Sequence, residues 1–77
     1  MAEARPTLGM LHAEARARLV QAGIEDAALD ARLLVEHFTK TSRTDALVRP
    51  ELEIAAPSVS ALDEALARRI LGMPVHR

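Results

Sequence analysis

The sequence predicts an all-α fold, a small antiparallel bundle of four to five helices. Hydrophobic residues make up 49% of the chain and are rich in Ala and Leu, two residues that favour helix over strand. Capping residues, prolines and glycines separate stretches whose apolar residues recur every three to four positions. Such stretches with short connections are typical of a helical bundle. With 77 residues, the chain suits one domain.

Charge and composition argue against several classes of function. The ten basic and eleven acidic residues give a formal net charge of -1, whereas a nucleic-acid binder normally presents a basic field to the phosphates. Phe38 is the only aromatic residue, so no platform for stacking bases is expected. The N-terminus has no long apolar run, which argues against a signal peptide or a membrane span. The sequence has no cysteine, which fits a reducing, cytoplasmic location.

A first helix is predicted for residues 8–22, after a flexible N-terminus at residues 1–6. Thr7 can cap its start, and Gly23 is the glycine expected just beyond its end. Its apolar stripe comprises Leu8, Leu11, Ala15, Leu19 and Ala22.

The charged residues of this helix are assigned to its solvated face. Glu14 and Arg18 stand four residues apart in the favourable order, so we expect a weak ion pair of about 0.3 kcal/mol. Arg16 and Arg18 could also form a binding patch, but a solvated face is the favoured interpretation.

The second helix is predicted for residues 27–38, with Asp26 as its N-cap. Its stripe is broad, which indicates a central helix contacted on more than one side. The stripe comprises Ala27, Leu29, Ala31, Leu33, Leu34 and Phe38. Asp30 lies beside this face, and a buried carboxylate without a partner is costly. We therefore expect Asp30 to bond with a neighbouring helix, with Arg69 as the candidate partner.

The stretch between Ser42 and Pro57 leaves the helix count open. Ser42 and Asp45 resemble a capping box in which Asp replaces Glu or Gln. This pair predicts a short helix that ends near Arg49, because Pro50 disfavours a helical residue before it.

The following residues, 51–57, have an ambiguous pattern. Leu52 and Ile54 alternate with acidic residues, which is also typical of a brief strand. An isolated strand would have no partner, so we interpret this segment as a loop or a single helical turn that docks Leu52 on the bundle.

The last helix is predicted for residues 59–71. Its apolar face comprises Val59, Leu62, Leu66 and Ile70. Ser60 and Asp63 could form a second capping-box-like pair. Positive charge in the last turn suits the helix dipole, and a glycine follows as the cap; these residues are Arg68, Arg69 and Gly72. The predicted core of the whole bundle is Leu8, Leu11, Leu19, Ile24, Leu29, Leu33, Leu34, Phe38, Leu47, Leu62, Leu66 and Ile70.

The residues alone indicate no active site. The histidines, His12, His37 and His76, are not spaced with other ligands as a metal site requires, and His37 is interpreted as a partly buried structural residue. The three glycines are isolated, so no phosphate-binding loop is present. We therefore assign no catalytic, cofactor-binding or metal-binding residue.

Two short motifs carry a resemblance to a known family. Residues 31–38, Ala-Arg-Leu-Leu-Val-Glu-His-Phe after Leu29-Asp30, resemble the Asp-Ala-x-Leu-Leu-x-x-His stretch near the start of a class of methyltransferases. Residues 69–75, Arg-Ile-Leu-Gly-Met-Pro-Val, resemble the Arg-x-x-Gly-x-Pro junction of the same proteins. With both motifs in this order, residues 7–77 are similar to the N-terminal domain of the peptide chain release factor glutamine N5-methyltransferases, the HemK family.

The resemblance implies an architecture larger than this sequence. Family members join a small helical bundle through a hairpin linker to a Rossmann-like catalytic domain, which binds S-adenosylmethionine and carries an Asn-Pro-Pro-Tyr motif for the glutamine amide. Neither the cofactor loop nor that motif occurs here. By this resemblance, residues 7–72 are the bundle domain and residues 73–77 begin the linker to a catalytic domain outside the sequence.

The resemblance also implies partners and a role. The partners are class I peptide chain release factors, whose Gly-Gly-Gln loop is methylated, and the protein's own catalytic domain; we expect a cytoplasmic monomer. The candidate contact residues are Arg68, Arg69, His76 and Arg77, near the exit of the last helix. The simpler alternative is that they pack against the linker. A free-standing helical protein-interaction module is the second functional hypothesis, and a helix-turn-helix nucleic-acid binder is disfavoured by the charge.

Overall fold

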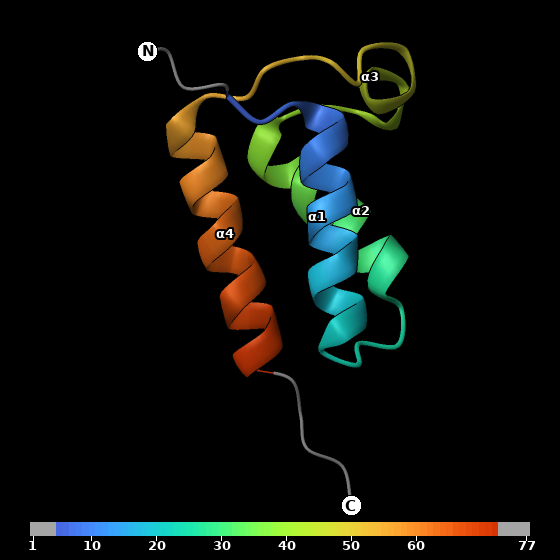
Figure 1. The fold of residues 1–77 in the computed structure, drawn as a ribbon, viewed down its shortest axis with the longest axis vertical. Helices are drawn as coiled ribbons and strands as arrows, with labels where there is room; N and C mark the ends of the chain where they lie inside the picture. Colours follow the sequence, from blue (N-terminus) through green and yellow to red (C-terminus); the bar gives the residue numbers. More distant parts are fainter. Residues whose placement is uncertain (1–4, 73–77) are drawn as a thin grey trace, which may run out of the picture.

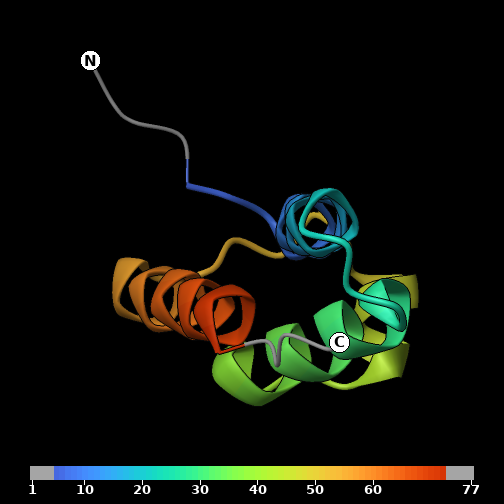
Figure 2. The same ribbon diagram turned by 90° about the horizontal axis from the view of Figure 1, so that it is seen from below.

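The computed structural model describes residues 5–72 and confirms the all-α class. Its four helices are α1 (Leu8–Gln21), α2 (Ala27–Thr39), α3 (Arg43–Val48) and α4 (Ala56–Leu71). The long helix α2 runs antiparallel to α1 and α4, and the short α3 lies at the end of the bundle where α1 begins (Figure 1). α2 packs against both other long helices, whereas α1 and α4 contact each other little. Seen from below, α1 and α4 diverge on one side of α2 (Figure 2). The prediction of a central second helix is therefore confirmed.

The caps of α1 are those expected from the sequence. The hydroxyl of Thr7 accepts a hydrogen bond from the Met10 amide at 3.2 Å. Gly23 has a φ of +81°, a backbone conformation that glycine adopts at little cost. The expected pair of Glu14 with Arg18 is wrong, because the Arg18 guanidinium bonds to Asp63 on α4 instead.

An extended segment before α4 supplies acceptors for the start of α1. The amide of Leu8 donates to the carbonyl of Leu52, and that of Gly9 donates to Pro50, both at 2.8 Å. The first amides of any helix lack acceptors within it, so this segment satisfies groups that would otherwise be unpaired. Our interpretation of residues 51–57 assumed that an extended segment would have no pairing partner, but the residues at the start of α1 are that partner. The pairing includes an isolated antiparallel bridge between Thr7 and Glu53.

Ile54 is a core residue that the sequence analysis missed. Its amide donates to the carbonyl of Pro6 at 3.0 Å, and its side chain is only 6% exposed. The backbone pairing therefore directs the isoleucine that follows Glu53 into the bundle. Leu52 is half-buried against the core, as expected.

The core face of α2 differs from the predicted stripe. Leu29 and Leu33 are 46% and 50% exposed, so their assignment to the core is wrong. Val35 is fully buried in their place, together with the alanines of this face. The structure gives α2 two neighbouring long helices, and both contact the side opposite to the two leucines. Asp26 holds the N-cap position but makes no side-chain capping bond.

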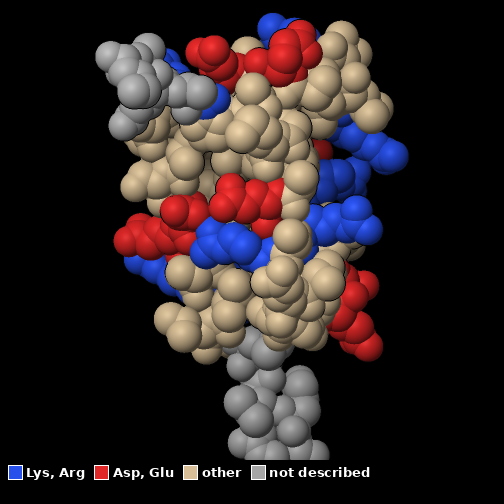
Figure 3. All heavy atoms as spheres, in the orientation of Figure 1, with Lys and Arg blue, Asp and Glu red and all other residues tan. Residues whose placement is uncertain are grey.

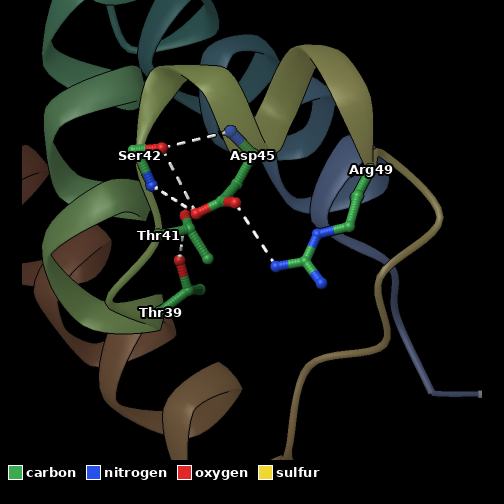
Figure 4. Close-up of polar contacts among 5 residues, drawn as sticks. All are labelled: Thr39, Thr41, Ser42, Asp45 and Arg49. Carbon is green, nitrogen blue, oxygen red and sulfur yellow. Dashed lines mark hydrogen bonds and ion pairs between the residues drawn. The ribbon is translucent and has the colours of Figure 1, made fainter.

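The predicted capping box of α3 is confirmed (Figure 4). The Asp45 amide donates to the Ser42 hydroxyl at 3.1 Å, and the Ser42 amide donates to the Asp45 carboxylate at 2.9 Å. The hydrogen bond from the Ser42 amide lowers the pKa of Asp45. Leu47 is 73% exposed, so its assignment to the core is wrong: α3 packs only lightly and has no fully buried residue.

The last helix begins at Ala56, three residues before the predicted start at Val59. Pro57 lies in its first turn, where a missing amide costs nothing. The predicted capping pair of Ser60 with Asp63 is therefore wrong, since both residues lie inside the helix. Gly72 is the C-cap, as expected.

The core combines confirmed leucines with small residues. Among the predicted core positions, those that are buried are Leu8, Leu11, Leu19, Ile24, Leu62 and Leu66. The half-buried ones are Leu34, Phe38 and Ile70. Alanines complete the buried cluster at Ala15, Ala27 and Ala31, which lets the helices approach closely. Within residues 5–72, none of the helices combines the length and the apolarity needed to cross a membrane.

Candidate functional site

The C-terminal turn of α4 carries the predicted contact residues that the structure describes. The side chain of Arg68 is 79% exposed, and its nearest acidic atom in the ion-pair geometry is on Glu64, at 4.0 Å. Such a long pair between two exposed side chains contributes little. Arg68 is therefore free to reorient toward a partner. His76 and Arg77 lie outside the described residues, and their assignment stays a prediction.

Arg69 has a different environment from Arg68. Its guanidinium donates to the Asp30 carboxylate at 2.8 Å, and both side chains are partly buried. This contact, predicted from the sequence, ties the last turn of α4 to the first turn of α2. Arg69 thus acts as an interhelical tie, and the two neighbouring arginines have separate roles.

A polar cluster lies between α1 and α2. The His12 Nε2 and Glu36 Oε2 atoms are both buried and without a hydrogen-bond partner. Burial lowers the pKa of His12. The nearby Arg32 guanidinium also lowers this pKa, whereas the Glu36 carboxylate raises it. The cluster has no further acidic or thiol ligand, and no group in residues 5–72 has the composition of a metal site.

His37 is not the partly buried residue that we expected. It is exposed, and its ring and that of Phe38 are nearly perpendicular, with centroids 4.8 Å apart. Neither described histidine is therefore arranged for nucleophilic or metal chemistry.

A shallow groove separates α1 from α4. Its volume is about 220 Å³, and its floor is formed by the apolar side chains of Leu11, Ala15, Leu62 and Leu66. The ion pair between Arg18 and Asp63 crosses the groove. Figure 3 shows acidic and basic side chains meeting across the middle of this face. The ion pair between Arg18 and Asp63 therefore partly closes the groove, which does not have the form of an open substrate cleft.

Comparisons with known proteins agree with the resemblance seen in the sequence. The PrmC N-terminal domain family matches residues 11–77. The chain is 40% identical over 63 residues to the release factor glutamine methyltransferase of Agrobacterium fabrum, which covers 82% of the chain and 22% of that protein. It is 36% identical over 61 residues to the protein of the same name from Caulobacter vibrioides, covering 79% of the chain and 21% of that protein. The chain thus spans about a fifth of the length of the curated relatives it matches. No solved structure is significantly similar to the chain.

Proposed function

This chain belongs to the PrmC N-terminal domain family, and we propose that it is the N-terminal domain of an enzyme that methylates the Gly-Gly-Gln glutamine of peptide chain release factors. The family match over residues 11–77 is the observation that carries this proposal. The names of the curated relatives support it, since each is a release factor glutamine methyltransferase.

The proposed division of labour places the chemistry outside this chain. Residues 7–72 form the bundle, residues 73–77 begin a linker, and the following catalytic domain binds S-adenosylmethionine and the glutamine amide. The ordered polar side chains support this division, because the capping box of Ser42 with Asp45 and the interhelical pairs of Asp30 with Arg69 and of Asp63 with Arg18 serve the bundle itself. The enzyme acts in the cytoplasm as a monomer with class I release factors as substrates.

The bundle contributes to substrate recognition. A single glutamine side chain offers little binding energy, so selecting one glutamine requires contacts remote from the reacting amide. A packed bundle supplies such contacts because its core fixes the positions of its surface side chains. Arg68 is a candidate contact, supported by its exposure, whereas Arg69 serves the bundle through Asp30.

The test compares two substrates and two forms of the enzyme. Methylation by the full-length enzyme and by a form lacking residues 1–72 is measured on intact release factor and on a short Gly-Gly-Gln peptide. We expect kcat/KM for the intact factor to fall about tenfold or more without the bundle, while the peptide rate holds.

Other outcomes contradict parts of the proposal. Equal losses on both substrates would make the bundle a structural support for the catalytic domain. An absence of methyl transfer by the full-length enzyme would contradict the activity itself. Binding of a partner by the bundle without any attached transferase would favour the free-standing interaction module.

A further inference from the structure

The outer face of α1 is apolar, which is unusual for a helix on the surface of a bundle. Its residues recur at steps of three, four and three and form what we name the outer stripe: Met10, Ala13, Ala17 and Val20. All of them are exposed, with Met10 at 59% and Val20 at 56%. This face is opposite to the buried stripe that begins at Leu8. A surface helix normally turns polar residues to this side.

The shape of the outer stripe suits another helix. Small side chains occupy its middle and larger ones its ends. A hollow of about 310 Å³ lies there, lined by Ala13, Arg16, Ala17 and Val20. The stripe extends from Met10 to Val20, which is about 15 Å along the helix axis and matches about three turns of a partner helix. Alanines at the centre allow two helix axes to approach to about 8 Å.

The charge at the hollow indicates which helix fits. Arg16 lines the hollow and is exposed. Within residues 5–72 it forms no ion pair, whereas Arg18 is paired with Asp63 on α4. A partner helix that carries a carboxylate beside its own apolar face could pair that carboxylate with the Arg16 guanidinium. Its apolar side chains would then cover the outer stripe.

Other exposed apolar residues lack this combination of features. Leu29 and Leu33 are only two positions, about one turn apart on α2. Leu47 and Val48 lie on a helix of only six residues. Among residues 5–72, the outer stripe is therefore the longest exposed apolar face on one helix, and it adjoins Arg16, which forms no ion pair there.

We propose that the outer stripe of α1 docks an amphipathic helix of the release factor, with a carboxylate of that helix against Arg16. The proposal rests on the proposed function and identifies the face of the bundle that meets the substrate. The contact is remote from the methylated glutamine, so it acts on binding of the intact factor and not on the chemical step. Helix-on-helix docking of this kind uses residues at the spacing of the outer stripe.

The test places a cation in the middle of the stripe. Ala17→Arg introduces bulk and like charge beside Arg16, while Arg and Ala have similar helix propensity. Ala67→Arg, at an exposed alanine on α4, is the matched control. In the full-length enzyme, we expect Ala17→Arg to lower kcat/KM for intact release factor about tenfold or more. The peptide rate and the Ala67→Arg enzyme should stay within about twofold of the wild type.

A second pair of variants tests the charge. Arg16→Glu should reduce kcat/KM for the intact factor, and the reduction relative to the wild type should be larger at low salt than at high salt. Arg16→Lys keeps the positive charge and should retain most of the wild-type kcat/KM. If Ala17→Arg and Arg16→Glu both methylate the intact factor like the wild type, or if Ala67→Arg loses as much, the docking face is wrong.

The proposed function can fail or stand separately from this inference. Suppose removal of residues 1–72 lowers the rate on the intact factor while the stripe variants do not. Recognition by the bundle would then hold and the outer stripe would be excluded. If the wild-type enzyme transfers no methyl group to the factor, both are overturned.

Discussion

The helices α1 and α4 bury similar inner faces but present opposite outer ones. Buried leucines line the inner face of each helix, such as Leu19 on α1 and Leu62 on α4. The outer side of α4 carries charged residues that include Glu64 and Arg68, as expected for a helix facing water. The outer side of α1 carries the outer stripe instead. The inner faces account for the fold, and the difference between the outer faces points to where a partner binds.

The largest expected effect is a difference in the free energy of unfolding between variants at two adjacent positions that lie on opposite faces of α1. Leu19 is fully buried and Val20 is 56% exposed. We expect Leu19→Ala to lower the free energy of unfolding by about 3 kcal/mol, through lost burial and the cavity left behind. Val20→Ala should change it by less than about 0.5 kcal/mol. Urea unfolding monitored by circular dichroism measures both, and comparable losses would show that the outer stripe also supports the fold.

A smaller effect is expected at the tie between α4 and α2. Asp30→Asn removes the charge that holds Arg69, and since both side chains are partly exposed the pair is screened by solvent. We expect a loss of about 0.5–1 kcal/mol in the free energy of unfolding, reduced by salt. Glu64→Gln, which alters the 4.0 Å pair with Arg68, is the control and should have no measurable effect. Equal losses would contradict the separate roles of the two arginines.

Features governed by local chemistry were predictable from the sequence. The capping box of Ser42 with Asp45 depends on residues three apart, and the glycine after α1 depends on one backbone angle. The tie between Asp30 and Arg69 was also predicted, because an acid beside an apolar stripe and an arginine in another helix's last turn have few other solutions.

Features governed by packing were not predictable in the same way. Leucines at 29 and 33 fit a helical stripe, but the directions of two neighbouring helices decide which side of α2 is covered. The burial of Ile54 depends on hydrogen bonds to the start of α1, which no local pattern encodes.

The outer stripe was visible in the sequence as a second periodic set on the first helix. Its members, Met10, Ala13, Ala17 and Val20, have the same spacing as a core face. Alanines are compatible with either environment, so only the packing of α1 reveals that this set is exposed. Arg16 is exposed to solvent, as expected, but the exposed side of α1 on which it lies also carries the apolar residues of the outer stripe.

The most direct measurement uses the double variant Met10→Gln/Val20→Gln of the full-length enzyme. It makes both ends of the outer stripe polar without touching the core. We expect an unchanged melting temperature, an unchanged rate on the Gly-Gly-Gln peptide, and a rate on intact release factor lowered about fivefold or more. A wild-type rate on the intact factor, or a lower melting temperature with equal losses on both substrates, would contradict the separation of the two faces of α1.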